Sequence, residues 1–220
     1  MNKPYVISCA SRSKNREQYE KSISKLKDSA ELVAIWFDDF PGCLYRFDPL
    51  PDMKLDPERW WVFTDYGDVV FQTPIPDLDI TKHEILVADE RQMHSNSYWP
   101  PFILIEPIFT PLLACTCYNA GTVAMKGYLF LEYIKYLQKF REKLKDKSTQ
   151  VYEMLIFNMW IQEHKYEIAE HPTLFTTLAC NIDARRVKFV NGKFVNAVGE
   201  PYTIIHANGD TKGWFKLINK

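Results

Sequence analysis

Residues 61–72 read WVFTDYGDVVFQ, an apolar segment interrupted by Asp65 and Asp68. A compact run of aromatic and β-branched residues is typical of a buried strand, which we expect over 60–71. Carboxylates at the point where a buried strand emerges are costly unless a metal ion or a cationic partner neutralises them. The segment therefore predicts a central strand with a functional site beside it.

Apolar runs and helical periodicities alternate along the rest of the chain. Further strands are expected over 5–10, 32–37, 85–88, 122–125 and 202–205, with a hairpin over 187–195. Helices are expected around 19–26 and over 129–144 and 150–163. This alternation predicts an α/β fold, a Rossmann-like sandwich in a single domain whose mostly parallel central sheet is flanked by helices.

Three polar residues stand where predicted strands end. Asp65, Asp89 and His206 each follow an apolar run, and parallel strands bring their carboxyl ends to one edge of a sheet. Carboxylate oxygens with one imidazole suit Mn²⁺ or Mg²⁺ better than zinc, and such an ion usually completes its shell with phosphate oxygens. Each residue also has a structural explanation, because Asp favours turns and a histidine can cap a strand end. Their joint placement favours a metal site that binds a nucleoside diphosphate.

The segment HANGDTKGW, residues 206–214, extends this hypothesis. Asn208 and Gly209 would allow close backbone approach, and Lys212 would supply a positive charge, so the turn could hold a diphosphate. An ordinary surface turn would have the same composition. The chain contains neither a P-loop pattern nor the glycine pattern of dinucleotide-binding folds, so those two classes are not supported.

Composition narrows the classes of partner. The chain has 27 Lys and Arg against 28 Asp and Glu, a balance that does not favour nucleic acid. No segment reaches the roughly 18 apolar residues of a membrane span, and the N-terminus does not read as a cleaved leader. The five cysteines lack paired C-x-x-C spacing, which favours a reduced chain without zinc. We therefore expect a cytoplasmic protein.

Several blocks of the chain resemble a known family in the same order. FTDYGDVVFQ (63–72), VADE (87–90), YNAGTVAMKG (118–127), LIFNMWI (155–161) and YTIIHANGDTKGW (202–214) resemble the blocks of GT-A glycosyltransferases. The nearest likeness is to the glycosyltransferase domain of procollagen lysyl hydroxylases and to collagen galactosyltransferase-like proteins. The chain is also similar to virus-encoded glycosyltransferases that build the capsid glycans of large algal viruses, which would place it in the host cytoplasm.

The resemblance implies a set of site residues. It assigns Mn²⁺, or Mg²⁺, to Asp65, Asp68 and His206, where the ion would bridge the diphosphate of a UDP-sugar. It assigns the nucleotide-sugar to three groups of residues: Ala10, Ser11 and Arg12 with Asp65, Tyr66 and Gly67; Asn119, Ala120 and Gly121; and Asn208, Gly209 and Lys212. Within these, Tyr66 would stack on uracil, and the Asn119–Gly121 segment would be a loop facing the donor sugar.

The same resemblance implies transfer of a hexosyl or deoxyhexosyl group from a UDP-sugar to a hydroxyl of a glycan or glycoprotein. Asp89 or Glu90 is the expected acceptor-side carboxylate. The family usually carries an Asp-Gln pair near a later helix, where this chain reads STQVYEMLIFN, so Glu153 is the acidic candidate there. Residues 1–90 would form the nucleotide-binding half, and residues 91–220 the acceptor half with the C-terminal metal and diphosphate segment.

Two other classes stay open from the sequence. A nucleotidyltransferase or pyrophosphatase acting on nucleotide sugars also uses metal-bound carboxylates and diphosphates. A non-catalytic domain that binds nucleotide sugars or glycans would explain the missing Asp-Gln pair. The donor sugar, the acceptor, the stereochemical outcome and the oligomeric state are not encoded in these motifs.

Overall fold

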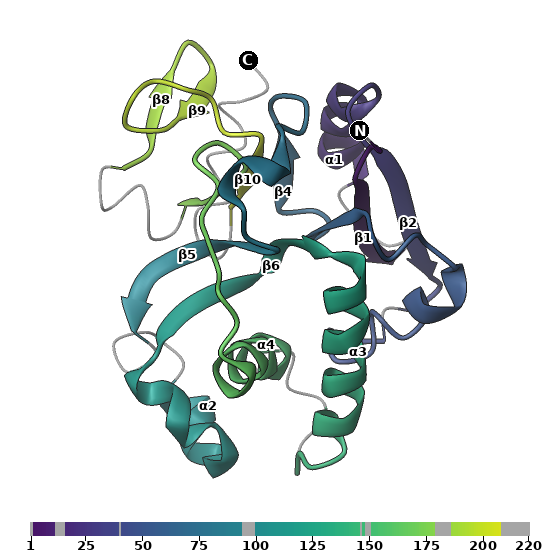
Figure 1. Cartoon of the computed structure of the whole chain (residues 1–220), viewed down its shortest axis with the longest axis vertical. Coiled ribbons are helices and arrows are strands. Elements are labelled where there is room, and N and C mark those ends of the chain that lie inside the picture. Colours follow the sequence, from purple (N-terminus) through teal and green to yellow (C-terminus); the bar gives the residue numbers. More distant parts are fainter. Residues whose placement is uncertain are drawn as a thin grey trace.

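The computed structural model describes residues 2–11, 16–39, 41–93, 100–145, 147, 151–178 and 186–207, with only the backbone for residues 11, 16–18 and 89–93. Two β-sheets pack over each other, and helices cover the free face of the larger one (Figure 1). The α/β sandwich is the fold class that the sequence predicts.

The main sheet has five strands in the order β2-β1-β3-β6-β5. These strands are β1 Tyr5–Ser11, β2 Glu31–Phe37, β3 Trp60–Thr64, β5 Ile85–Met93 and β6 Thr116–Lys126. Strand β1 is parallel to both β2 and β3, whereas β6 is antiparallel to both β3 and β5. The sheet is therefore mixed rather than mostly parallel. The connection from β5 returns the chain at the same end of the sheet, so β6 runs back beside β5 instead of crossing over.

The expected single strand over 60–71 is two strands in different sheets. Strand β3 ends at Thr64, and the chain then turns through the Asp65–Asp68 segment into β4, Val69–Phe71. Gly67 permits this turn with φ +98°, a conformation that side-chain-bearing residues rarely adopt. Strand β4 belongs to a second sheet of order β4-β10-β7 with β10, Ile204–His206, and β7, Phe175–Thr177.

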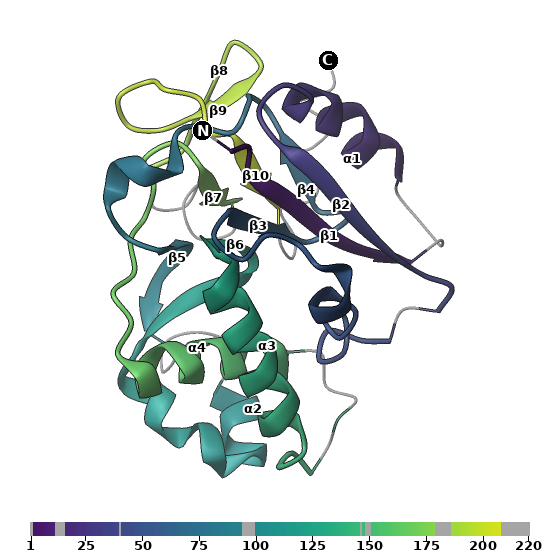
Figure 2. The same cartoon turned by 45° about the vertical axis from the view of Figure 1, so that its right-hand side comes forward.

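Helices α3, Gly127–Arg141, and α4, Tyr152–His164, cover one face of the main sheet, together with α2, Pro100–Ile105 (Figures 1 and 2). Both α3 and α4 lie within a few residues of their expected positions. Ten consecutive residues of α4, from Tyr152 to Ile161, are buried, because the helix lies between the sheet and its neighbours on every side. This apolar core holds the main sheet in place against the helices.

The opposite face of the main sheet packs against the second sheet and against α1, Arg16–Ile23. Val62 and Ala124 of the main sheet share a core with Phe71 and Ile204 of the second. Short 3₁₀ helices connect these elements: η1 Ser24–Leu26, η2 Leu50–Met53, η3 Leu78–Thr81 and η5 Pro107–Ala114.

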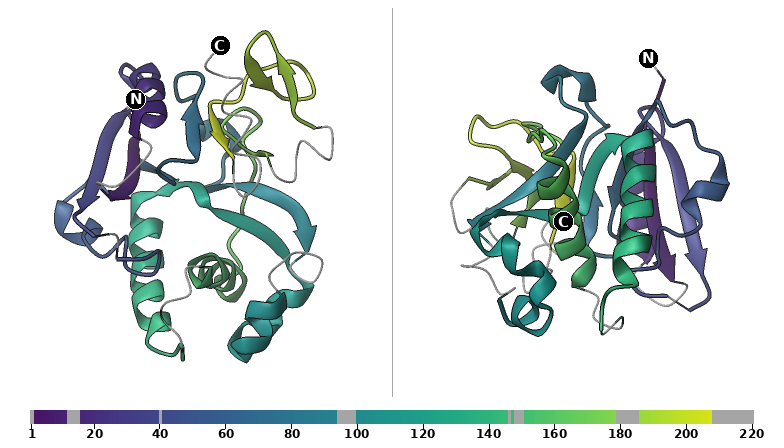
Figure 3. Two further views of the ribbon diagram at one scale, coloured as in Figure 1. Left: turned by 180° about the vertical axis from the view of Figure 1, so that it is seen from behind. Right: turned by 60° about the horizontal axis from the view of Figure 1, so that its bottom comes forward.

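The expected hairpin is present as β8, Lys188–Val190, and β9, Lys193–Val195. Asn191 and Gly192 both have positive φ, which suits a tight two-residue hairpin turn. The hairpin extends away from α3 and α4 at the opposite end of the molecule (Figure 3). Among the helices in the described ranges, none is long and apolar enough to cross a bilayer.

Candidate metal centre and its surroundings

Asp65, Asp68 and His206 come together where the two sheets meet. Both aspartates lie in the β3–β4 connection, and His206 is the last residue of β10, where it pairs with Val69. His206 Nε2 lies 3.5 Å from Asp65 Oδ2 and 3.7 Å from Asp68 Oδ1. One possible ligand atom from each residue lies within 4.8 Å of the others, so the three side chains could hold one metal ion.

Asn119 fixes the proton position on His206. The backbone N–H of Gly121 donates to Asn119 Oδ1 at 2.8 Å, which identifies that amide atom as the oxygen. His206 Nδ1 lies 3.2 Å from the same oxygen and must therefore carry the proton. Nε2 faces the two carboxylates, and in the neutral imidazole its lone pair would be available to a metal ion, as in a metal-binding histidine oriented by a second residue.

Gly121 packs directly against these side chains. A Cβ atom at this position would lie 2.4 Å from Asp65 Oδ2 and 2.7 Å from His206 Cε1, so a larger residue would displace both. The Gly121 carbonyl also accepts a hydrogen bond of 2.7 Å from the backbone N–H of Asp65. The Asn119–Gly121 segment was expected to be a loop, but it lies within β6. A shift in register, with Val87 opposite Val123 but Ala88 opposite Asn119, makes the strand bulge here toward the site.

Arg46 is a site residue that the sequence does not reveal. Its buried guanidinium donates from Nη1 to Asp65 Oδ1 at 2.5 Å and from Nη2 to Glu153 Oε2 at 2.6 Å. The group also lies over the Phe63 ring, with Cζ 4.4 Å from the ring centroid. The available signal was the sequence LYRF (44–47), in which a charged residue interrupts an apolar run.

Glu153 reaches the site through Arg46 and is itself buried in α4. Burial raises the pKa of its carboxyl from the usual 4.5 to about 7, and Arg46 opposes this effect. Tyr133 Oη lies 3.4 Å from Glu153 Oε1. The structure thus brings Glu153 next to the predicted metal ligands, with the Arg46 guanidinium between its carboxylate and Asp65.

The raised pKa of Glu153 predicts a pH-dependent stability. A carboxyl with a higher pKa in the folded protein contributes stability that is complete below the unfolded pKa and is lost as pH rises through the folded value. For Glu153 this window runs from 4.5 to about 7. We therefore expect the free energy of unfolding of Glu153→Gln to fall less than that of wild type between about pH 5 and about pH 8. Urea denaturation in the presence of a chelator measures the free energy of unfolding of both proteins at each pH. Parallel pH profiles for the two proteins would contradict the prediction.

For several other predicted site residues, the structure describes only the backbone or does not describe the residue. Asp89 and Glu90 do not follow the strand as expected but lie inside β5, whose pairing continues to Met93 opposite Thr116. The apolar run ends at Ala88, but backbone pairing does not require apolar side chains, so the sequence placed the strand end too early. The side chains of Asp89 and Glu90 fall outside the described part of the chain. So does the side chain of Ser11, and so do Arg12, Asn208, Gly209 and Lys212 entirely.

Aromatic residues gather at the carboxyl ends of β1 and β2. The Tyr66 ring lies 4.6 Å from that of Tyr19 and 5.8 Å from that of Trp36, measured between centroids. Trp36 is 43% exposed and pairs in register with Ala10, whose own side chain is buried. Ala10 therefore offers almost no exposed surface to a ligand. The aromatic rings lie beside the predicted metal ligands because Tyr66 is in the same turn as Asp65.

Structural comparisons identify several proteins of the same architecture. A glycosyltransferase involved in glycosylation of the major capsid of the virus PBCV-1 matches with a TM-score of 0.57 and 12% identity, over all of both chains. The galactosyltransferase LgtC, bound to donor and acceptor sugar analogues, matches with 0.56 and 10% identity, over 98% of this chain and 95% of LgtC. The apo glycosyltransferase GlyE of Streptococcus pneumoniae matches with 0.58 and 11% identity, over 100% of this chain and 61% of GlyE.

No protein-family model matches the chain, and no curated protein matches its sequence. At 10 to 12% identity the structural matches establish the fold and leave donor and acceptor open. The mixed sheet flanked by helices agrees with these matches, which cover 98 to 100% of this chain. The chain therefore has the GT-A fold of the glycosyltransferases that it resembles.

Proposed function

We propose that this protein is a metal-dependent glycosyltransferase that transfers a sugar from a nucleoside-diphosphate sugar, a UDP-sugar in our hypothesis, to a hydroxyl of a glycan or glycoprotein. The observation that carries the proposal is the cluster of Asp65, Asp68 and His206 within a GT-A fold, with His206 Nε2 turned toward both carboxylates. The fold alone would be compatible with other chemistry, so the proposal depends on this cluster.

The donor atoms of the cluster suit Mn²⁺ or Mg²⁺. Two carboxylates and one imidazole supply oxygen and nitrogen ligands and leave coordination positions for phosphate oxygens. The Nδ1 proton held by Asn119 and the absence of a side chain at Gly121 both fit an ion at this place. When bound, such an ion supplies positive charge that stabilises the departing nucleoside diphosphate.

The nucleotide is proposed to lie along the carboxyl ends of β1 and β2. Tyr66 would stack on the base, and the backbone from Ala10 to Arg12 would contact the base and ribose. Asn208, Gly209 and Lys212 would hold the diphosphate, following directly after His206 in the chain. In this proposal residues 1–90 supply the nucleotide half, and the remaining residues supply the acceptor half and the last metal ligand.

Side chains of this protein would have two roles in the reaction: positioning a metal ligand and accepting a proton. Arg46 holds Asp65 by a short ion pair and is held in turn by Glu153, so the first metal ligand has a fixed orientation. Since the Arg46 guanidinium lies between Glu153 and Asp65, we assign Glu153 the role of positioning Arg46. Asp89 or Glu90 remains our candidate to accept the proton of the acceptor hydroxyl if the reaction inverts the anomeric centre.

A thermal-shift panel of nucleotide sugars, each with and without Mn²⁺, tests the proposal. Stabilisation by a UDP-sugar that requires the metal is the expected result, because ligands that bind only the folded state raise its stability. No stabilisation by any nucleotide sugar would overturn it. Product analysis separates the alternatives: a glycosyltransferase releases intact nucleoside diphosphate, whereas a pyrophosphatase splits it, and a binding domain gives no turnover.

Asn119→Ala should weaken Mn²⁺ binding without removing a ligand. The substitution deletes the oxygen that accepts from both His206 Nδ1 and the Gly121 N–H, so the imidazole loses its fixed orientation. Loss of such a second-layer contact typically weakens metal binding about 10- to 100-fold. Isothermal titration calorimetry measures the change, and Asn119→Asp, which keeps the acceptor oxygen but adds a negative charge near the proposed ion, is a comparison variant that should not weaken binding. Equal affinities for all three proteins would show that Asn119 does not orient His206.

A further inference from the structure

A cavity of about 520 Å³ lies between the loop after β9 and the segment that leads into β7. Its floor includes Ala88 of β5 and Phe175 of β7, and its rim includes Tyr202, just before β10. The volume is within the range of sites for small ligands, roughly 300 to 1,000 Å³. It is large enough for one or two sugar rings, and none of the roles proposed above uses it.

The two walls of this cavity are fastened to each other by Asn196. Its Oδ1 accepts hydrogen bonds from the backbone N–H groups of Val198 at 3.1 Å and Glu200 at 2.9 Å. Its Nδ2 donates to the carbonyl of Pro172 on the opposite wall at 3.3 Å. The buried Asn196 therefore holds the loop in place, and the cavity is formed without a ligand.

The lining suits a neutral polyhydroxyl ligand better than an anion. Phe175, Tyr202 and Pro172 supply apolar surface on which the C–H face of a sugar could rest, as aromatic side chains often do. The charged lining residues are Glu170, Glu200 and Arg186, two negative against one positive. The excess of negative charge disfavours phosphate. The two carboxylates can accept hydrogen bonds from hydroxyl groups, and the guanidinium can donate to them.

His171, which also lines the cavity, does not change this balance. Its Nε2 lies 3.0 Å from the carbonyl oxygen of Asp77, and its Nδ1 accepts from the backbone N–H of Thr173 at 3.2 Å. The ring is therefore neutral, with its only proton on Nε2, and burial lowers its pKa.

The cavity begins close to the metal cluster. Phe175 pairs with Ile204, which precedes His206 by two residues, about 7 Å along a strand. On the other side, Ala88 pairs with Asn119, whose side chain contacts His206. Two lining residues are therefore strand neighbours of residues at or near the metal cluster, and a longer glycan with one unit in the cavity could extend its end toward that cluster.

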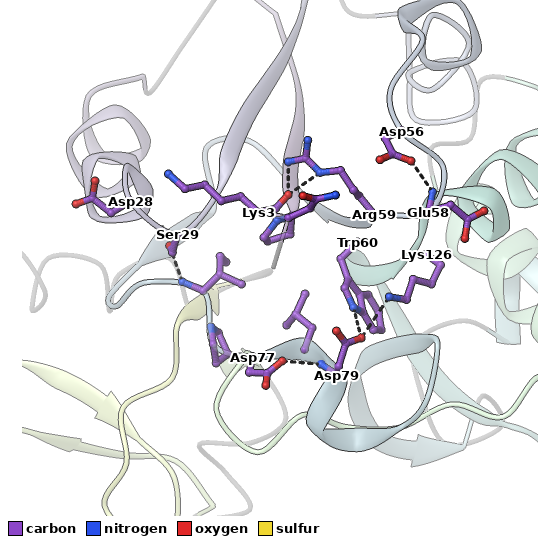
Figure 4. Close-up of a pocket in the computed structure, with 15 residues that line it drawn as sticks. Lys3, Asp28, Ser29, Asp56, Glu58, Arg59, Trp60, Asp77, Asp79 and Lys126 are labelled. Carbon is purple, nitrogen blue, oxygen red and sulfur yellow. Dashed lines mark hydrogen bonds and ion pairs between the residues drawn. The ribbon is translucent and has the colours of Figure 1, made fainter.

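A second cavity of about 500 Å³ lies at the opposite, amino-terminal ends of β1 and β3 (Figure 4). Several of its polar groups already have partners within the protein. Arg59 donates to the Lys3 carbonyl, and Trp60 Nε1 and Lys126 both contact Asp79 Oδ1, at 2.8 and 3.2 Å. It is also remote from the metal cluster, so it does not compete as the acceptor site.

We propose that the cavity beside β7 binds a neutral saccharide unit of the acceptor glycan. This inference rests on the proposed glycosyltransferase function and extends it by naming where the acceptor is held and what chemistry it has. It would place one sugar of an oligosaccharide in the cavity and direct the hydroxyl that accepts the transferred sugar toward the metal cluster.

Saturation-transfer NMR with a panel of methyl glycosides of galactose, glucose, mannose, fucose, rhamnose and xylose tests the proposal. At least one glycoside should give a signal with the wild-type protein. Ala197→Trp should abolish it, because Ala197 lines the cavity on its exposed rim and the indole would fill the space. Lys188→Trp is the matched control, since this exposed residue of the hairpin does not line the cavity.

Arg186→Ala provides a second variant that leaves the core untouched, because Arg186 is exposed. Losing a charge-assisted hydrogen bond should weaken glycoside binding roughly tenfold. No signal with any glycoside, or a signal that both Ala197→Trp and Arg186→Ala retain, would overturn the proposal. Stabilisation by UDP with Mn²⁺ is measured on the same proteins. If UDP or any nucleotide sugar of the panel above stabilises the wild type and no glycoside binds, the acceptor site alone is wrong; if none of them stabilises it, the proposed function is wrong.

Discussion

Asp68→Ala is expected to abolish metal-dependent sugar transfer while leaving the fold intact. Asp68 would contribute one of the two carboxylates of the metal site, and its Oδ1 lies 3.7 Å from His206 Nε2. Removing a charged ligand leaves the metal with too few negative partners to bind at working concentrations, and transition-state charge stabilisation of this kind is worth about 10²- to 10³-fold or more in rate. Transfer assays at increasing Mn²⁺ concentration measure the loss.

Asp68 is a cleaner test than Asp65. Asp65 also pairs with the buried Arg46, so its removal would leave that guanidinium with a missing partner and confuse stability with activity. Asp52→Ala, which removes an exposed carboxylate in η2, controls for the change in net charge. A folded Asp68→Ala protein with undiminished metal-dependent turnover would exclude Asp68 as a ligand.

Gly121→Ala is expected to reduce Mn²⁺ affinity and transfer almost as severely, although it removes no ligand. The added methyl group would overlap Asp65 Oδ2 at 2.4 Å and His206 Cε1 at 2.7 Å, so both side chains must leave their present positions. Productive geometry must be held within about 0.5 Å, and displacement beyond that disrupts a metal site. Calorimetric titration with Mn²⁺ measures the affinity, and circular dichroism verifies the fold.

Gly127→Ala separates this effect from simple overpacking. Its Cβ would meet Trp61 Nε1 at 2.4 Å, a comparable steric conflict at the start of α3 and away from the metal cluster. Overpacking of this kind usually costs about 1 to 3 kcal/mol of stability. We expect Gly127→Ala to lower the melting temperature but to retain Mn²⁺ affinity. If the two variants bind Mn²⁺ equally well, Gly121 has no special relation to the site.

The sequence predicted the cluster of Asp65, Asp68 and His206 because Asp65 and His206 each follow an apolar run and Asp68 lies three residues after Asp65. In the structure Asp65 directly follows β3 and His206 is the last residue of β10. Both are at strand ends, as predicted, although the two strands belong to different sheets. Strand direction was less predictable. Periodicity shows that a segment is buried but not which way its neighbour runs, so the antiparallel pairing of β6 with β3 and β5 was missed.

Arg46 and β7 illustrate what a single sequence does not reveal. The partners of Arg46 are 19 and 107 residues away, and only the folded chain brings Asp65 and Glu153 to one guanidinium. Strand β7 has three residues, too few for a recognisable alternation, and it exists because β10 offers it a partner. Asp89 shows the converse error, since pairing of the backbone continued beyond the apolar side chains.

The pairing of β4 with β10 has a consequence for synthesis of the chain. Strand β4 follows the two aspartates immediately, but its partner β10 is more than 130 residues later, at Ile204–His206. Contacts between such distant segments form late, because a long loop must close first. A nascent chain emerging from the ribosome would therefore carry both carboxylates long before the imidazole arrives, and the proposed metal site would be complete only when translation has passed residue 206.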